Sequence, residues 1–347
     1  MRALIRFKEL RRMQSARLAA AAVVVVAVVA GVAGTVAGQG SAAPGFKSPK
    51  LKHGLLMIKG SEAGEKIALR LRPGQPGILQ VDVGDDGLPD FEFERADIAE
   101  IAVDARAGDD LVRIDESAGI FTTSIPTTID GGGGDDTLAG GSGAETLQGG
   151  GGNDRIDGNR GNDVAFLGGG EDTFVWDPGD GSDTVEGQGG VDTLLFNGAN
   201  IDEKVELSAN GKRLRFFRDV AGITMDTDGV ERVDFNALGG ADLVTVNDLR
   251  GTDVTDVNVD LAGAAGGGDG QADRVVVNGT DRNDTIHVSG GVPGVNVSGL
   301  AATVHIFHPE AANDRLEVNT RAGRDRVDAG GLTAGAIQLF VNGVLVP

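Results

Sequence analysis

The sequence predicts an all-β protein assembled from a short, regular repeat. Three observations carry this prediction. A nine-residue period of glycines and acids runs through residues 131–195, and no long helical period appears after the first 43 residues. The apolar residues are mainly Val, Ile, Leu and Ala, because aromatic residues make up only 4% of the chain and Tyr is absent. Such a composition favours many thin strands over a core built around aromatic anchors. With 347 residues the chain is long enough for a large core or about two domains.

The charge of the chain argues for cations as partners. The net charge is −21, and residues 131–195 contain 13 Asp and Glu against 2 Arg. An acidic surface of this kind disfavours nucleic acid and anionic lipid as partners. Cysteine is absent, which excludes disulfides, thiolate metal sites and cysteine nucleophiles.

The first 43 residues are typical of an export signal. A basic stretch from Arg2 to Arg17 is followed by an apolar run from Leu18 to Gly38, and then by the small residues Ser41-Ala42-Ala43. This order favours a cleaved secretory signal peptide. The apolar run is also long enough to span a bilayer, so an uncleaved anchor stays open as the alternative. Residues 44–60, with Pro44 and Pro49, are expected to form a linker into the mature protein.

A nine-residue unit occurs seven times between Gly131 and Leu195. The units read GGGGDDTLA, GGSGAETLQ, GGGGNDRID, GNRGNDVAF, LGGGEDTFV, PGDGSDTVE and GQGGVDTLL, with Trp176-Asp177 inserted after the fifth. The sixth position always carries an acid: Asp136, Glu145, Asp154, Asp163, Asp172, Asp183 and Asp192. The eighth position is apolar: Leu138, Leu147, Ile156, Ala165, Phe174, Val185 and Leu194. A fixed short period indicates a repeat architecture.

These units resemble the GGxGxDxUx nonapeptide of the RTX (repeats-in-toxin), haemolysin-type calcium-binding proteins. The resemblance covers residues 131–195, about a fifth of the chain. It implies a parallel β-roll or β-solenoid with calcium-binding GGxGxDxUx turns, and we expect irregular β-solenoid-like turns on both flanks. It also implies that carbonyl groups of turn glycines complete the shell of the ion, and the glycines concerned are Gly131, Gly133, Gly140, Gly149, Gly151, Gly158 and Gly169.

The spacing of the units has a physical explanation. The residues around the eighth position can form a short strand with the apolar side chain inward, and the six residues before it can form a turn in which glycine permits positive φ. Two units then make one coil, so acids two units apart stack. One predicted column contains Asp136, Asp154, Asp172 and Asp192, and the other contains Glu145, Asp163 and Asp183. The inserted Trp176-Asp177 is expected to bulge without breaking either column.

Stacked carboxylates repel one another unless a cation lies between them. Ca²⁺ takes six to eight oxygen ligands in flexible geometry, whereas Mg²⁺ requires tighter octahedral geometry. These turns contain no imidazole or thiolate for zinc. We therefore expect Ca²⁺ as the cofactor, with the best sites around Asp136/Asp154 and Asp154/Asp172. The segment is expected to be disordered without calcium and to fold outside the cell.

Some units depart from the pattern. Glu145 replaces Asp and is expected to weaken one site, Asn159 and Gln188 replace glycines, and Leu167 opens the fifth unit. A Gly/Asp-rich disordered linker is the alternative for the whole segment, and the inward apolar period disfavours it.

The flanks contain less regular copies of the same unit. Residues 102–117, 233–249, 275–290 and 316–331 each combine an alternating strand, a glycine-containing turn, an acid and a second strand. The acids in question are Asp110, Asp242, Asp284 and Asp325. We expect them to be structural, because single turns without neighbours in strict register stack poorly. Residues 58–71 have the same shape, with Lys66 where an acid would stand.

Two further loops invite a specific interpretation. The stretch DVGDDGLPDFEF places Asp82, Asp86 and Asp90 at positions 1, 5 and 9 of an EF-hand-like loop, but Phe93 replaces the Glu of position 12. We therefore predict a plain turn there. Asn210-Gly211 predicts a β-hairpin.

The sequence gives little support for an enzyme. It contains no HExxH, GxSxG or GxxxxGK[ST] motif. His305 and His308 are three residues apart, and on a strand they would face opposite sides, which disfavours a metal site. The alternative is a calcium-dependent polysaccharide lyase, epimerase or glycosidase on a β-helix. In that case KRLRFFR at 212–218 would border a substrate groove, although a polar strand edge that blocks aggregation is the more common role of such a cluster.

The sequence thus predicts a secreted calcium-binding protein with no catalytic residues. Its expected role is structural, surface-related or adhesive, with a cell-surface or matrix partner and without nucleic acid. The predicted organisation is a signal peptide or anchor, a linker, an N-terminal β-rich region, the RTX-like β-roll and a C-terminal irregular solenoid, with the bounds 1–43, 44–60, 61–130, 131–195 and 196–347.

Overall fold

The computed structural model describes residues 32–33, 35–36 and 45–347, and the fold lies within one compact unit, Ala33–Pro347. The expected export signal therefore lies almost entirely outside the described residues. The fold is all-β, as predicted, and the helical elements among the described residues are the short 3₁₀ turns η1 (Arg95–Asp97) and η2 (Val220–Gly222). Within the part of the chain that the structure describes, no helix is long and apolar enough to cross a membrane.

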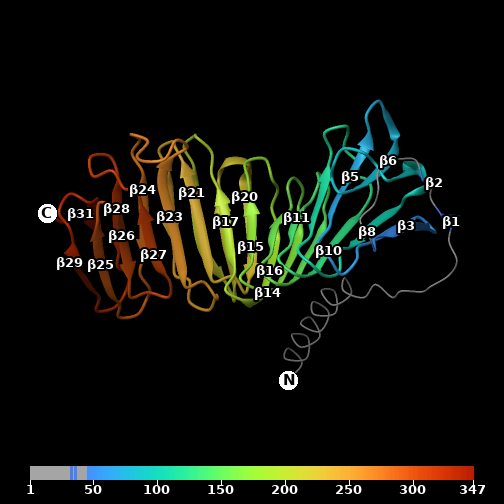
Figure 1. Ribbon diagram of the computed structural model, residues 1–347. Helices are drawn as coiled ribbons and strands as arrows, with labels where there is room; N and C mark the ends of the chain where they lie inside the picture. Colours follow the sequence, from blue (N-terminus) through green and yellow to red (C-terminus); the bar gives the residue numbers. More distant parts are fainter. Residues whose placement is uncertain (1–31, 34, 37–44) are drawn as a thin grey trace, which may run out of the picture. The chain divides into compact units, whose positions relative to one another are not determined.

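All the described strands lie in two long sheets, of 16 and 15 strands (Figure 1). The first sheet contains, in spatial order, β1 (Val32–Ala33), β3 (Lys47–Lys52), β4 (Leu55–Lys59), β8 (Glu100–Asp104), β10 (Thr127–Gly133), β12 (Thr146–Gly151), β14 (Val164–Gly170), β16 (Thr184–Gly190), β20 (Ile223–Asp228), β19 (Arg213–Arg218), β18 (Lys204–Asn210), β22 (Leu243–Val246), β24 (Arg274–Asn278), β28 (Arg315–Asn319), β30 (Gln338–Val341) and β31 (Val344–Leu345). The second sheet contains β2 (Thr35–Val36), β7 (Phe91–Glu94), β6 (Gln75–Val83), β5 (Lys66–Arg72), β9 (Leu111–Asp115), β11 (Thr137–Ala139), β13 (Arg155–Asp157), β15 (Thr173–Trp176), β17 (Thr193–Asn197), β21 (Arg232–Leu238), β23 (Asp256–Gly263), β27 (Thr303–Phe307), β26 (Gly294–Ser298), β25 (Thr285–Gly291) and β29 (Arg326–Leu332).

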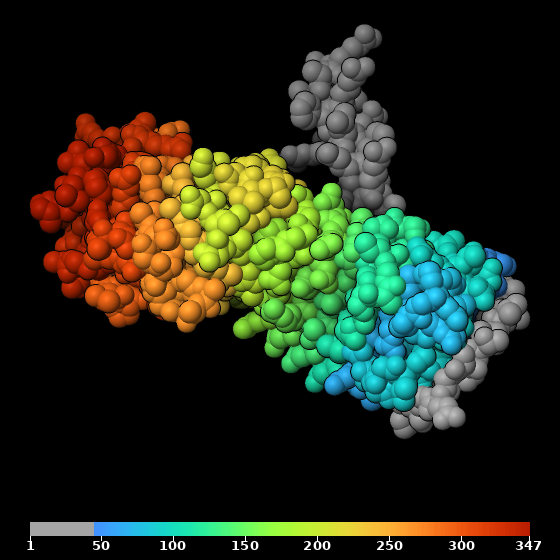
Figure 2. Space-filling model, turned by 90° about the horizontal axis from the view of Figure 1, so that it is seen from above, coloured from blue at the N-terminus to red at the C-terminus, as the bar shows by residue number. Residues whose placement is uncertain are grey.

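The chain winds through the two sheets as a parallel β-solenoid. In the repeat, each unit contributes one strand, and successive units alternate between the sheets, so one coil consists of two units. The register confirms this period: Leu138 pairs with Ile156 in the second sheet, and Ile129 pairs with Leu147 in the first, 18 residues apart in both cases. Figure 2 shows the coils following one another in sequence order, so each coil packs mainly on its immediate neighbours.

The core is one continuous cluster of inward side chains between the two sheets. The apolar residues at position eight, including Leu138, Leu147 and Ile156, are fully buried between the sheets. Outward positions on the same strands are half-buried or exposed, which gives the alternation expected of a strand with one buried face. Burial of this cluster stabilises each coil against the next by removing apolar surface from water.

The expected linker is part of the solenoid. Residues 47–59 form the antiparallel hairpin β3–β4, and β4 then pairs in parallel with β8. Leu56 and Ile58 are fully buried in the core. The prediction of a linker over 44–60 is therefore wrong for these residues, because two prolines and four lysines obscure strands whose inward positions are apolar.

The insertion Trp176-Asp177 lengthens a strand instead of forming only a bulge. Trp176 ends β15, is 1% exposed and stacks on Phe196 with ring centroids 4.0 Å apart. Its indole Nε1–H donates to the carbonyl oxygen of Gly181 at 2.8 Å. Phe216 and Phe235 continue this aromatic cluster, which marks the point where the regular repeat passes into the C-terminal region.

Antiparallel insertions interrupt the parallel winding on both flanks. The predicted hairpin at Asn210-Gly211 is confirmed as β18–β19, and β20 completes a three-stranded insertion. Because β19 lies between two strands, residues 212–218 are not a sheet edge, which corrects that expectation. Arg213 instead forms ion pairs with Glu186 at 2.8 Å and with Asp226 at 2.6 Å.

The EF-hand-like stretch is a turn between β6 and β7, as predicted. Asp82 is fully buried and forms an ion pair with Arg70 at 2.7 Å. Its Oδ2 also accepts a hydrogen bond from the Gly87 amide at 2.9 Å. These contacts use Asp82 as a structural residue of the turn.

Candidate metal centre

The seven acids of the repeat each stand directly before a strand and are almost fully buried. Asp136, Asp154, Asp172 and Asp192 precede strands of the second sheet, whereas Glu145, Asp163 and Asp183 precede strands of the first. Their exposure lies between 0% and 3%. The two groups therefore lie in the two opposite rows of turns, in the two columns that the sequence predicts.

A ladder of hydrogen bonds connects each acid to the next coil. The Asp136 amide donates to Asp154 Oδ1 at 2.8 Å, the Asp154 amide donates to Asp172 Oδ1 at 2.7 Å, and the Asp172 amide donates to Asp192 Oδ1 at 3.0 Å. In the other column the amides of Glu145 and Asp163 donate to the Oδ1 atoms of Asp163 and Asp183. The insertion at Trp176 breaks neither ladder.

The second carboxylate oxygen of most of these acids has no partner. Among the described residues, buried Oδ2 atoms without a hydrogen bond belong to five repeat acids: Asp136, Asp154, Asp163, Asp172 and Asp192. A buried, unpaired carboxylate oxygen is costly, because it has lost its water and gained nothing in exchange. A cation would remove that cost, so these atoms fit a metal.

Burial raises the pKa of the repeat acids, and neighbouring carboxylates raise it further. The pKa is about 6 for Asp136 and Asp154, about 7 for Asp183 and Asp192, and about 9 for Asp163. The pKa values of Asp172 and Glu145 are also raised by burial. Without a cation, the folded protein therefore binds protons at these acids more tightly than the unfolded chain does, whereas a bound cation would lower their pKa values.

Glycine at the first position of a unit leaves room beside the unpaired oxygen. A Cβ on Gly131 would collide with Asp136 Oδ2 and would lie 2.8 Å from the carbonyl oxygen of Gly149 in the next coil. A Cβ on Gly149 would likewise lie 2.5 Å from Asp154 Oδ2. Carboxylate and carbonyl oxygens thus face the same small space, and they are the ligand types that calcium takes.

The predicted glycine ligands divide into two groups. Carbonyls at the first position, such as those of Gly149 and Gly158, point toward the glycine of the preceding coil beside its acid. Carbonyls at the third position are used in the backbone ladder, since Gly151 and Gly169 accept from the amides of Gly134 and Gly152 at 2.8 and 3.0 Å. The first group therefore fits a ligand role better.

The same turns contain a second set of oxygens, which was not predicted from the sequence. In part of the repeat, the residue before the acid forms a second ladder, in which the Asn153 amide donates to Asp135 Oδ1 at 2.7 Å and the Glu171 amide donates to Asn153 Oδ1 at 2.8 Å. Fourth-position carbonyls stack beside these side chains, because a Cβ on Gly152 would clash with the carbonyl oxygen of Gly134 and meet Asp135 Oδ1. The signal was present in the sequence as repeated Asp and Asn at position five.

Glu145 differs from the aspartates of the repeat. Both of its carboxylate oxygens have backbone partners, since Oε2 accepts from the Gly141 amide at 2.9 Å and Oε1 accepts from the Gly143 amide at 3.1 Å. Its longer side chain reaches the amides of its own turn. This geometry is consistent with the weaker site expected there.

Ligands from the backbone are indispensable for any ion in these turns. Among the residues that the structure describes, no group of three or more His, Cys, Asp or Glu side chains is placed to hold a metal. His305 and His308 contact different carboxylates, Asp256 at 3.3 Å and Asp260 at 2.7 Å. An ion at the repeat therefore needs one or two carboxylates together with several carbonyls.

The fold and the turns together define a parallel β-solenoid with buried acids and glycine carbonyls in its turns. The family of the RTX calcium-binding nonapeptide repeat matches this chain in four copies, over residues 128–144, 140–174 and 179–200. The chain therefore contains RTX calcium-binding repeats, and they coincide with the coils described above. A comparison with curated proteins gives no match.

Proposed function

We propose that this protein is exported and that its repeat binds Ca²⁺, folds on binding it, and serves a structural or adhesive role at the cell surface or in the matrix. The proposed ligands are the repeat acids together with first-position carbonyls such as those of Gly131, Gly140, Gly149 and Gly158. The observation that carries the proposal is the set of five buried Oδ2 atoms without partners, in register with the matched repeats. Export is supported by the basic and apolar order of residues 1–43.

Calcium in this role acts on stability. Extracellular calcium modules bind with dissociation constants of about 10⁻⁴ to 10⁻³ M. At about 1 mM Ca²⁺, each site would then stabilise the fold by about 0.4 to 1.4 kcal/mol. Several such sites together are comparable with the whole stability of a typical domain, which is about 5 to 15 kcal/mol.

Circular dichroism of the purified protein tests the proposal. We expect the strand signal to fall when a chelator removes Ca²⁺ and to return when Ca²⁺, but not Mg²⁺, is added at the same concentration. Calorimetric titration of the same sample gives the number of sites. An identical spectrum with and without chelator, together with no heat of binding, would refute it.

One surface feature supports the alternative of an enzyme acting on polysaccharide. A hollow of about 210 Å³ lies on the outer face of β21, β23 and β27, and it is lined by Leu195, Asp234, Phe235, Asn236, Asn258, Asp260 and Phe307. Phe307 is 39% exposed there, and amides and carboxylates of this type can hydrogen-bond to sugar hydroxyls. Release of product from uronate polysaccharides in the presence of calcium would favour this alternative over a structural role.

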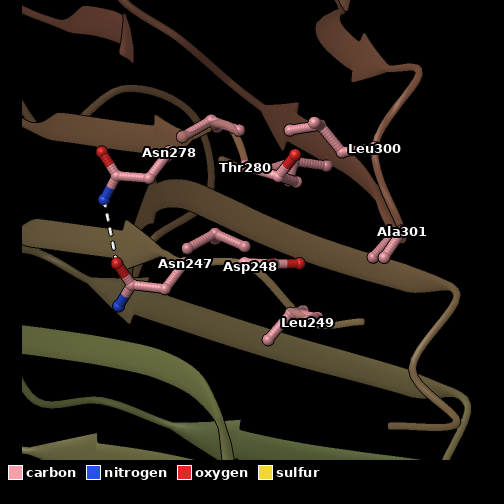
Figure 3. A pocket seen from close by; sticks show the side chains of 11 residues that line it. Asn247, Asp248, Leu249, Asn278, Thr280, Leu300 and Ala301 are labelled. Carbon is pink, nitrogen blue, oxygen red and sulfur yellow. Dashed lines mark hydrogen bonds between the residues drawn. The ribbon is translucent and has the colours of Figure 1, made fainter. Parts of the chain in front are cut away.

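A second hollow is too small to bind a ligand. It lies near β22 and β24 and is bordered by Asn247, Asp248, Thr280 and Leu300 (Figure 3). Its volume of about 10 Å³ suffices for about one water molecule. Two asparagines beside this hollow belong to a ladder that links three coils. Asn278 Nδ2 donates to Asn247 Oδ1 at 3.0 Å, and Asn319 Nδ2 donates to Asn278 Oδ1 at 3.2 Å.

A further inference from the structure

Ladders of acids of the same kind occur on both sides of the matched repeats. On the N-terminal side, the Glu65 amide donates to Asp110 Oδ1 at 2.6 Å, and the Asp110 amide donates to Asp136 Oδ1 at 2.7 Å. On the C-terminal side, the Asp192 amide donates to Glu231 Oε2 at 2.9 Å. A separate ladder begins beyond the inserted strands β19 and β20, where the amides of Glu203 and Asp242 donate to the Oδ1 atoms of Asp242 and Asp273, both at 2.8 Å. These acids therefore stack in register although their spacing in the sequence is irregular.

These hydrogen bonds correct two predictions: which residue of 58–71 holds the acid position, and how well the flanking turns stack. In residues 58–71 the acid position is held by Glu65, which stands beside Asp110, and not by Lys66, which pairs with Leu111. The expectation that the flanking turns stack poorly is wrong at Asp110, Asp242 and Asp284, because their backbone amides donate to the Oδ1 atoms of Asp136, Asp273 and Asp325. The hairpin insertions absorb the extra chain length, so the coils that carry the acids remain adjacent.

Most flanking acids have no oxygen to offer a cation. Both oxygens of Glu65 bond to Ser61, both oxygens of Asp284 bond to Thr280, and Asp314 accepts from the amides of Asp273 and Glu310. Glu203 forms a buried ion pair with Arg218 and also accepts from the Ala199 amide. In these turns the protein's own donors satisfy the carboxylate.

Asp110 and Asp242 are different in two independent respects. Each is 3% exposed, and each has a buried Oδ2 without a partner, as five repeat acids do. Each also retains glycine at the fourth position of its turn, Gly108 with φ +102° and Gly240 with φ +106°, so the backbone follows the path of the repeat turns. By contrast, Ala63, Arg282 and Ala312 hold that position before Glu65, Asp284 and Asp314.

At both turns a carbonyl and a glycine of adjacent coils also lie close together, as in the repeat. The Gly108 carbonyl oxygen points at Gly134 in the next coil, and the Ile201 carbonyl oxygen points at Gly240, in both cases where a Cβ would clash. Alanine holds the first position at Ala105 and Ala237. Leu167 holds the first position of the unit that contains Asp172, and Asp172 Oδ2 also has no partner. Glycine is therefore not required at the first position for the carboxylate oxygen to remain unpaired.

We propose that Asp110 and Asp242 each contribute a Ca²⁺ site outside the recognised repeats. The Asp110 site directly extends the column of Asp136, and the Asp242 site lies in a separate ladder beyond the inserted strands β18–β20. This inference rests on the proposed calcium function of the repeat. It goes beyond it by assigning ions to turns that the repeat family does not match, and by denying them to Asp284 and Asp314.

The test uses the full chain and counts bound calcium by equilibrium dialysis against CaCl₂, with MgCl₂ as the comparison. Asp110→Asn and Asp242→Asn are each expected to lose one ion, and the double variant two. Asparagine keeps the Oδ1 acceptor of the ladder and replaces only the unpaired oxygen. Asp284→Asn and Asp314→Asn are the matched controls, and both should bind as many ions as the wild type.

The outcomes separate this inference from the proposed function. If the wild type binds no calcium, the proposed function fails. If the wild type binds calcium and Asp110→Asn and Asp242→Asn bind just as many ions, the proposed function stands and this inference is overturned. It is equally overturned if the two controls also lose an ion each.

Hydrogen exchange of the wild type provides a second measurement that needs no variant to fold. The amides of 105–111 and 237–243 should gain protection on addition of Ca²⁺ by the same factor as those of 149–155. The amides of 309–315 should gain much less. Equal protection at all four segments, or none at the first two, would contradict the two added sites.

Discussion

At the scale of single residues, the question is which oxygen of each acid is free. In the repeat, Oδ1 of each aspartate accepts the amide of the preceding coil, and this leaves Oδ2 for an ion. A glutamate in the same place uses both oxygens within its own turn, as Glu145 does. The difference of one methylene therefore separates a candidate ligand from a carboxylate that caps its own turn.

Exchanging two repeat acids tests this assignment. Asp154→Asn/Asp172→Asn should lose at least one bound Ca²⁺, because each substitution removes an unpaired oxygen while retaining the ladder. The calcium-dependent part of the unfolding free energy should fall by about 0.4 to 1.4 kcal/mol per lost site. Calorimetric titration and urea unfolding with and without Ca²⁺ measure both quantities.

Asp157→Asn is the matched control, because Asp157 lies in the same coil and faces outward from β13. It removes one charge without touching the ladder, and calcium uptake should be unchanged. Undiminished uptake in the double variant would show that the repeat aspartates are not ligands.

At the scale of elements, the insertion β18–β20 shows how the solenoid continues without a metal at Glu203. Arg218 and Glu203 form an ion pair with side chains only 4% and 0% exposed. The Arg218 guanidinium also lies 5.2 Å from the centre of the Trp176 ring. A side-chain cation thus neutralises an acid of the column, at the point where the aromatic cluster closes the regular repeat.

Removing this cation should be costly. Arg218→Met would leave the Glu203 carboxylate buried without its partner, and we expect a loss of about 3 to 5 kcal/mol in the free energy of unfolding. Arg215→Met, on the same strand but over the ring of Phe217 at 4.5 Å, should cost about 1 kcal/mol or less. Urea unfolding in saturating Ca²⁺ measures both.

The double variant Arg218→Met/Glu203→Gln should recover part of the loss, because it removes the uncompensated charge as well. A loss at Arg218 no greater than that at Arg215 would contradict the structural role of the buried pair.

At the scale of the whole molecule, the columns link pH to stability. Burial raises the pKa of Asp136 and Asp154 to about 6, and that of Asp183 and Asp192 to about 7, above the ordinary value near 4. A raised carboxylate pKa means that the folded state binds protons more tightly than the unfolded state does. The resulting stability is complete below about pH 4 and is lost as the pH rises through 6 and 7.

We therefore expect the calcium-free protein to become less stable between pH 5 and pH 8. In saturating Ca²⁺ this loss should be small or reversed, because a bound cation favours the charged carboxylates. Exposed carboxylates with ordinary pKa values are already ionised at pH 5, so the change reports on the buried acids. Thermal unfolding in calcium-depleted buffers across this range is the measurement, and stability that rises with pH without calcium would be the contrary result.

Much of the repeat could be predicted from the sequence, because its information is local. The nine-residue period fixes which residues turn inward, and two periods close one coil, so the pairing of Leu138 with Ile156 follows directly. The match of residues 128–200 to the RTX repeat family agrees with that prediction. The hairpin at Asn210-Gly211 was equally local, since its turn residues require no distant partner.

The tertiary structure alone decided the parts that depend on distant residues. Asp110 stacks on Asp136 across 26 residues and Glu203 on Asp242 across 39, because insertions of different length lie between coils that remain adjacent. Which acid retains an unpaired oxygen depends on whether Ser61, Thr280, Glu310 or Arg218 reaches it. The sequence by itself thus determined the repeat and its acidic columns through fixed covalent spacing. Only the folded chain decided where those columns end, because side-chain donors from elsewhere compete with a cation for each carboxylate.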